Sequence, residues 1–180
     1  MSATAPAARF ERLRLTFSQL WPSSKCRALL AFSRQQLLDA LEQANHALAL
    51  DPERPLAHYL RAVALLAATS GMTVQTTRDA ENALRRAIAA APALAPAYTA
   101  LGGLLAARDG PSLEARMLIQ RAITLDPSAI GHQVALGQVL LMSGDTVEAQ
   151  QVAERARAAA RTLTERESVE RLLAAARRRQ

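Results

Sequence analysis

The chain has 180 residues, of which 50% are hydrophobic but only 3% are aromatic, and its formal net charge is +6. A single cysteine, Cys26, excludes a disulfide framework and a cysteine-based metal site. No apolar run reaches the ~18 residues of a membrane span and no signal-peptide stretch opens the chain, so we expect a cytoplasmic protein.

The predicted elements begin with a loose tail and a short amphipathic helix, which together form a first segment at residues 1–20. The apolar side of this helix consists of Phe10, Leu13, Phe17, Leu20 and Trp21. We expect this side to cover the end of the fold, with a second interface for a partner or for a homo-oligomer as the alternative. A membrane-surface helix is the weakest of the three interpretations.

Helices in antiparallel pairs are predicted after Pro22. The pairs cover about residues 23–33 and 36–50, 54–69 and 77–90, 94–108 and 112–125, and 129–142 and 146–161. Asp109-Gly110-Pro111-Ser112 provides a stop, a turn and a new N-cap within the third pair. Thr76 with Asp79 is predicted to cap the helix that begins there, and Thr164 with Glu167 is predicted to start a last helix at about 164–178.

A pattern of small residues recurs through these pairs. It reads Ala80-Leu84-Ala87-Pro92 and returns as Ala115-Ile119-Ala122-Pro127, and Ala40-Ala44-Ala47-Pro52 and Ala149-Ala153-Ala156 keep the same spacing. The prolines fall at 52, 92 and 127, a period of roughly 35–40 residues. Such a period indicates a helical solenoid, whose units bury their apolar faces only against their neighbours. The sequence therefore predicts an all-α fold.

Several segments resemble one repeat family. Leu48-Ala49-Leu50-Asp51-Pro52 and Ile123-Thr124-Leu125-Asp126-Pro127 resemble the ends of tetratricopeptide repeats, and so do Tyr98-x₂-Leu101-Gly102-x₂-Leu105 and Leu136-Gly137-x₂-Leu140. The resemblance covers roughly residues 21–163. It implies a right-handed α-solenoid of about four antiparallel helix pairs, with an N-terminal helix and a C-terminal capping helix at 164–180 that has a basic end. The units would lie at about 21–54, 55–94, 95–129 and 130–163.

The match to this family differs between the units. The first unit lacks the Leu-Gly pair, and the second has about six extra residues at its turn and Arg61 where the family prefers Leu. Close packing explains the small residues, because only small side chains let two helices of a pair approach where they cross. The residues expected at such crossings are Gly102, Gly137, Ala115 and Ala149.

The resemblance also implies a concave groove lined by the first helix of every pair. The inward positions would be Lys25, Leu29, Phe32, Leu56, Tyr59, Val63, Leu66, Thr99, Gly103, Ala106, Val134, Gln138, Leu141 and Met142. Because this set is mostly apolar, we expect it to bind an apolar or amphipathic segment of a partner protein. The alternative is that neighbouring units or the second-unit loop cover these side chains. A clamp for a chaperone's C-terminal carboxylate is disfavoured, since Leu29 stands where it needs Asn.

No catalytic or metal-binding pattern is present in the sequence. His46, His58 and His132 have no histidine or cysteine at i+3 or i+4, so we expect solvated or partly packed rings. No phosphate loop or nucleophile motif occurs, and the carboxylates are scattered. We therefore predict no cofactor, no metal and no enzyme activity, and instead an adaptor within an assembly or secretion machine.

Two alternative functions remain open at this stage. A bacterial secretion chaperone resembles this chain in size and repeat count, although many such chaperones are acidic. A nucleic-acid-associated solenoid would use the basic ends. Residues 1–34 carry six basic and one acidic side chain, residues 35–150 carry eight and eleven, and residues 151–180 carry eight and four. Because no basic stripe crosses the repeats, nucleic acid is disfavoured.

Overall fold

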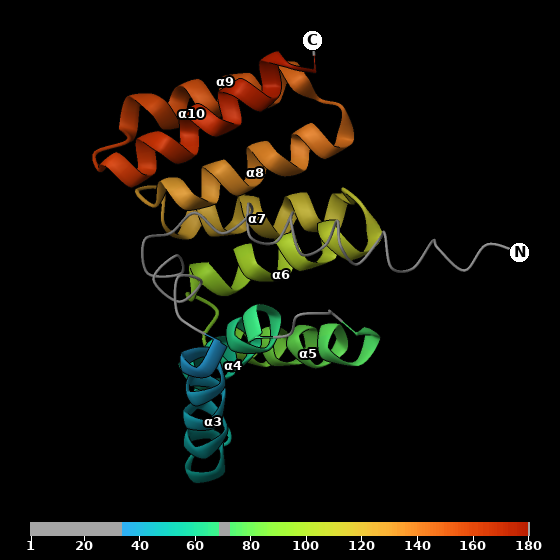
Figure 1. The fold of residues 1–180 in the computed structure, drawn as a ribbon, viewed down its shortest axis with the longest axis vertical. Helices are drawn as coiled ribbons and strands as arrows, with labels where there is room; N and C mark the ends of the chain where they lie inside the picture. The colour runs from blue at the N-terminus through green and yellow to red at the C-terminus, as the bar shows by residue number, and fades with distance from the viewer. Residues whose placement is uncertain (1–33, 69–72, 180) are drawn as a thin grey trace, which may run out of the picture.

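The computed structural model describes residues 34–68 and 73–179, and their regular structure is entirely helical. The helices of this part are α3 (Arg34–Leu50), α4 (Pro55–Ala68), α5 (Val74–Ala90), α6 (Ala95–Asp109), α7 (Leu113–Leu125), α8 (Ile130–Ser143), α9 (Thr146–Ala159) and α10 (Leu163–Arg177). Figure 1 shows α5 to α10 lying across the long axis in successive layers, whereas α3 runs along that axis at one end. The predicted all-α solenoid is confirmed.

Packing between the helices follows the predicted pairs. α4 packs on α5, α6 on α7 and α8 on α9, while α10 packs on both α8 and α9. The first helices of two neighbouring pairs, α6 and α8, also touch. The predicted helices at about 7–20 and 23–33 lie outside the described residues.

The repeated alanines of the second to fourth units lie inside the fold, whereas Ala40 and Ala47 of the first are partly buried. Ala80, Ala115 and Ala149 are fully buried, in the same apolar cluster as Leu84 and Ile119. This confirms the register in which the small residues face neighbouring helices. The helices can approach closely there, because a larger side chain would push them apart.

The two glycines of the Leu-Gly pairs lie against different neighbours. A Cβ on Gly102 would come within 2.8 Å of the Ala115 carbonyl oxygen on α7, as expected for the crossing of α6 and α7. A Cβ on Gly137 would instead meet a methyl group of Leu172 on α10 at 2.5 Å. The small residue in α8 therefore makes room for the C-terminal helix.

The predicted caps are wrong at two helix starts. The capping box of α5 consists of Thr73 and Thr76, so the helix begins earlier than the predicted box of Thr76 and Asp79. In α10 the box consists of Thr162 and Glu165, two residues before the predicted Thr164. At α10 the sequence contains two overlapping candidates of the same form, Thr-x-x-Glu. At α5 the observed pair has threonine at N3 in place of the usual Glu or Gln, so the sequence pattern does not find it.

The turn between α6 and α7 has the predicted structure. Gly110 ends α6 with a φ of 92°, a backbone conformation that residues other than glycine rarely adopt. Ser112 then caps α7, because its hydroxyl oxygen accepts a hydrogen bond from the Ala115 N–H at 3.2 Å.

A hydrogen bond from the sixth residue after each repeat proline recurs in three units. His58 Nε2 donates to the Pro52 carbonyl at 2.7 Å, the Tyr98 hydroxyl donates to the Pro92 carbonyl at 3.0 Å, and Gln133 Nε2 donates to the Pro127 carbonyl at 3.4 Å. Three different side chains thus donate to the equivalent proline carbonyl, which precedes the first helix of each unit. The sequence pattern did not reveal this tie, because residue identity differs at the repeated position.

Ion pairs join the second helices of successive pairs. Arg85 of α5 lies 3.1 Å from Glu114 of α7, and Arg116 of α7 lies 3.0 Å from both Asp145 and Glu148 at the start of α9. Each such exposed pair contributes at most about 1 kcal/mol.

Arg85 also binds a second carboxylate, that of Glu81, which forms an ion pair with Arg108 as well. Burial raises the pKa of Glu81, but hydrogen bonds from Arg108 and Arg85 outweigh this and hold the pKa below its ordinary value. Glu81 is thereby kept ionised between two arginines, on α6 and α5.

Candidate interaction surface

The predicted inward positions form a stripe along the first helices of three pairs, which we call the inner stripe. It consists of Tyr59, Val63 and Leu66 on α4, Thr99, Gly103 and Ala106 on α6, and Val134, Gln138 and Leu141 on α8. Spacings of four and three residues place each set on one side of its helix. All of these residues except Gln138 are buried, and Gln138 is partly buried.

Burial of the inner stripe changes what binding requires. Val63 and Leu66 belong to the same apolar cluster as the repeat core, as does Leu141. A partner that contacts these side chains therefore has to uncover them first. Of the other predicted positions, Leu56 is 54% exposed and Met142 is partly buried. Lys25, Leu29 and Phe32, and the second predicted interface at Phe10, Leu13, Phe17, Leu20 and Trp21, lie outside the described residues.

A buried hydrogen bond joins the neighbouring first helices α6 and α8 at the inner-stripe residue Thr99. Thr99 Oγ1 of α6 lies 2.7 Å from His132 Nδ1 of α8, and both side chains are buried. Burial lowers the pKa of His132, although the negative charge of Asp126 acts in the opposite direction. His132 Nε2 is also buried and has no hydrogen-bond partner among the described residues. Both ring nitrogens carry a hydrogen in the protonated form, so its Nε2–H would be buried with no acceptor among the described residues.

We expect mild acid to destabilise the protein through His132. Because the folded pKa lies below the ordinary 6.5, the unfolded chain binds the proton first as the pH falls. The stability associated with neutral His132 is thus present above pH 6.5 and is lost below it. Urea unfolding at about pH 7.5 and about pH 5.5 measures this loss, which should be smaller in His132→Gln. An equal loss in both proteins would contradict it.

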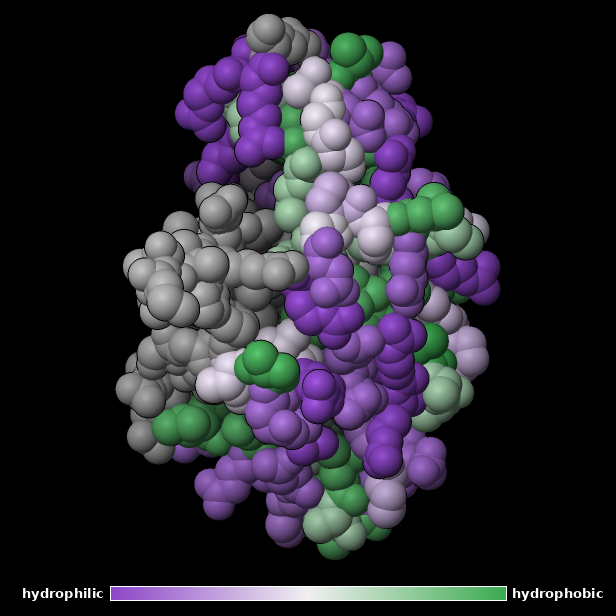
Figure 2. Space-filling view, turned by 90° about the vertical axis from the view of Figure 1, so that its right-hand side faces the viewer, coloured by the Kyte–Doolittle hydropathy of each residue, from purple (hydrophilic) through white to green (hydrophobic). Residues whose placement is uncertain are grey.

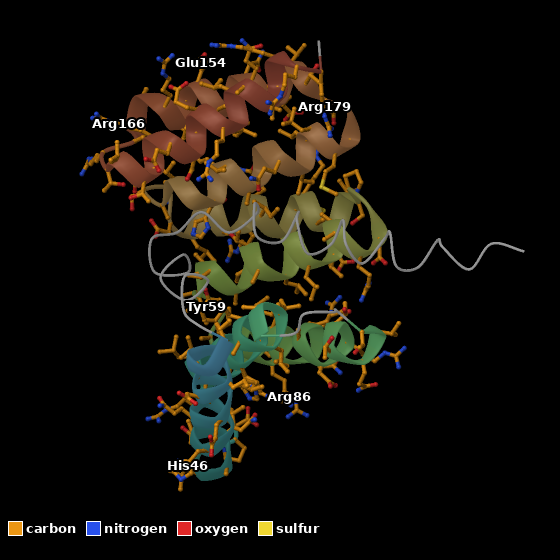
Figure 3. All side chains as sticks on the ribbon, viewed as in Figure 1. His46, Tyr59, Arg86, Glu154, Arg166 and Arg179 are labelled. Atoms are coloured by element: carbon orange, nitrogen blue, oxygen red, sulfur yellow. The ribbon has the colours of Figure 1, made fainter. Side chains whose placement is uncertain are left out.

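The basic C-terminal end has a structural role. Arg179 donates a hydrogen bond from Nη1 to the Leu141 carbonyl, in the last turn of α8. Figure 3 places this side chain at the end of the molecule where α8 and α10 meet. Cations stabilise a helix C-terminus, where carbonyl groups lack partners within the helix. One of the terminal arginines therefore caps a neighbouring helix.

Within residues 34–68 and 73–179 no group of three or more histidine, cysteine or carboxylate side chains could hold a metal ion. In the same ranges no helix has the length and apolar character needed to cross a membrane. Hydrophilic residues predominate on the side of the molecule in Figure 2, and hydrophobic residues are scattered among them. The most exposed large hydrophobic side chains of the described residues are Leu50, Leu113, Leu163, Val147, Val74 and Met117.

Solved structures with the same arrangement of helices decide the fold. The crystal structure of the yeast Tom70 matches with a TM-score of 0.62 over 74% of this chain, at 22% sequence identity. The crystal structure of MamA matches with a TM-score of 0.57 over 77% of this chain, at 17% identity. Both are tetratricopeptide-repeat proteins. The chain has the tetratricopeptide-repeat fold.

The extent of these similarities differs between the two structures. The match spans 28% of the Tom70 chain and 85% of the MamA chain. No model of a protein family matches the sequence, and neither does any curated protein. The tetratricopeptide-repeat fold of this chain is therefore shown by the arrangement of its helices.

Within the tetratricopeptide-repeat solenoid, the structure shows contacts that sequence reasoning missed. His132 was expected as a solvated or partly packed ring, and it is buried and bonded to Thr99. His58 is also buried, and its ring closes the turn after Pro52. Their positions in the repeat could have indicated this burial, because His58 lies six residues after Pro52 and His132 five residues after Pro127. His46 is exposed.

Proposed function

We propose that this protein is a non-enzymatic scaffold whose inner stripe holds an apolar or amphipathic segment of a partner protein. The observation that carries the proposal is the recurrence of the stripe at equivalent positions of α4, α6 and α8, with Tyr59, Val63 and Leu66 as its most apolar set. The tetratricopeptide-repeat fold of Tom70 and MamA supports an interaction role.

In the proposed binding, the partner segment replaces the contacts that bury the inner stripe in the free protein. The inner stripe is buried in the free protein, so the cost of uncovering it reduces the apparent affinity for the partner. A partner that presents apolar side chains at helical spacing recovers this cost by covering the same area. The inner stripe should therefore select apolar segments over polar ones, because a polar segment does not bury the apolar side chains again. A setting in an assembly or secretion machine, and the role of a secretion chaperone, remain predictions.

A photo-crosslinking pair tests the proposal. Met142 lies partly buried beside the inner stripe, and Met117 is 62% exposed on α7. Each is replaced in turn by a benzoylphenylalanine, and the proteins are irradiated in the cells that produce the protein naturally. We expect a covalent adduct with a partner protein at position 142 and none at 117.

The two positions serve as each other's control, because both replace one methionine with the same bulky group. Adducts of equal yield at both positions, or an adduct at 117 alone, would place the partner elsewhere and overturn the proposal. Circular dichroism of both variants verifies that the helices remain formed.

A further inference from the structure

An arginine-lined cleft lies between α4 and α5, on the part of the solenoid next to α3. Its lining includes Arg61 of α4 and Asp79, Asn82, Arg85 and Arg86 of α5, and its volume is about 610 Å³. Figure 3 shows Arg86 on the side of α5 that faces away from α6. α3 packs on α4 and diverges from the direction of the other helices, which leaves this side of α5 open.

Arg61 departs from the repeat at this cleft. It lies nine residues after Pro52, and the residues nine after Pro92 and Pro127 are Leu101 and Leu136. Both leucines are buried, with 1% and 8% of their surface exposed. The second unit thus has a charged side chain where the others have a core leucine. Such a replacement costs stability unless the charge finds a partner.

The structure of the free protein does not supply that partner. Arg61 Nε is buried without a hydrogen-bond partner in the described part of the chain. Within the same part, Arg61 and Arg86 form no ion pair, whereas Arg85 is bound to Glu81 at 2.9 Å and to Glu114 at 3.1 Å. The carboxylate of Asp79 accepts a hydrogen bond from Gln75 at 2.9 Å. Two guanidinium groups therefore remain available in the cleft.

We propose that this cleft binds carboxylate side chains from an acidic segment of a partner protein. The planar guanidinium donates two parallel hydrogen bonds to a carboxylate, which suits the free groups of Arg61 and Arg86. The Asn82 amide adds a neutral donor at the same lining. This site uses none of the inner stripe, so it goes beyond the function proposed above and stands or fails independently of it.

The charges around the cleft favour an acidic protein segment over nucleic acid. Asp79 lines the cleft itself, and Glu81 and Glu114 lie beside it on Arg85. A phosphodiester backbone carries charge continuously and would pass these carboxylates, whereas a short pair of acidic side chains reaches only the free arginines.

Arg61→Leu provides the sharpest variant. It restores the residue that the equivalent positions of α6 and α8 contain, so we expect a folded protein with a higher melting temperature. The matched control is Arg121→Leu, which removes the same charge from an exposed arginine on α7 that does not line the cleft. Arg86→Gln removes the second free guanidinium.

The experiment titrates the full chain with a short peptide in which one Glu-Glu pair is flanked by glycine and serine, and follows the Nε–Hε signal of Arg61 by NMR, with fluorescence anisotropy of the labelled peptide for affinity. We expect the Arg61 signal to shift and the affinity to fall about tenfold in Arg61→Leu and in Arg86→Gln, but less than about twofold in Arg121→Leu. Inorganic phosphate and a single-stranded oligonucleotide are added as competitors, and neither should displace the peptide at equal charge concentration.

Equal losses in Arg61→Leu and Arg121→Leu would show a general attraction between opposite charges and overturn the site. An unchanged Arg61 signal would do the same. Displacement by phosphate would indicate an unselective anion site, and tighter binding of the oligonucleotide would indicate nucleic acid as the ligand. Either result would overturn the assignment to an acidic protein segment.

Discussion

Gly102→Ala is expected to destabilise the fold by about 1–3 kcal/mol, although alanine is favoured over glycine inside a helix by about 1 kcal/mol. The added methyl group would lie 2.8 Å from the Ala115 carbonyl oxygen and 2.7 Å from Ile119 Cγ1. The carbonyl belongs to the backbone of α7, so the contact is relieved only if the two helices separate. Urea unfolding monitored by circular dichroism measures the change in the free energy of unfolding.

Gly137→Ala is the matched comparison. The nearest atoms to its added methyl group are all in the side chain of Leu172, which can rotate away. We therefore expect a smaller loss than for Gly102→Ala. Alanine stabilises a solvent-exposed helix position relative to glycine. A gain in stability for Gly102→Ala would therefore mean that α6 and α7 do not approach closely at this point.

Leu173→Ala is expected to destabilise the protein by about 2–5 kcal/mol, which is among the largest effects of a single truncation. Leu173 on α10 is fully buried in the same cluster as Leu140 on α8, so truncation leaves a cavity under the C-terminal helix. The measurement is again urea unfolding, with the thermal midpoint as a second readout.

Leu163→Ala controls for the loss of a leucine from the same helix. Leu163 is 74% exposed, and its truncation should change the free energy of unfolding by no more than about 0.5 kcal/mol. Equal small effects of the two truncations would contradict the packing of α10 on α8, and α10 would then be an appendage to the solenoid.

Periodicity explains why the helices and their buried sides were predictable. Ala80, Ala115 and Ala149 follow the repeat, and their burial requires only that each unit pack like its neighbours. Helix starts were less predictable where two capping candidates overlap. Thr162 with Glu165 and Thr164 with Glu167 have the same form, and the structure uses the first pair. The local sequence does not distinguish between two such pairs.

The candidate sites depended on contacts between units, which a repeat pattern does not contain. The bond between Thr99 and His132 joins residues 33 positions apart, and it exists only because α6 and α8 lie side by side. Arg61 was visible in the sequence as a departure from the family. The cleft that it lines could not be predicted, since it depends on how α4 packs on α5 and on the direction that α3 takes.

The contacts between second helices and those of the inner stripe differ in how they respond to dissolved salt. The ion pairs from Arg85 to Glu114 and from Arg116 to Glu148 join second helices and are partly exposed, so mobile ions weaken them. The apolar contacts of the inner stripe are not weakened by screening of charge. A change in ionic strength therefore acts on the contacts between the second helices more than on those of the inner stripe.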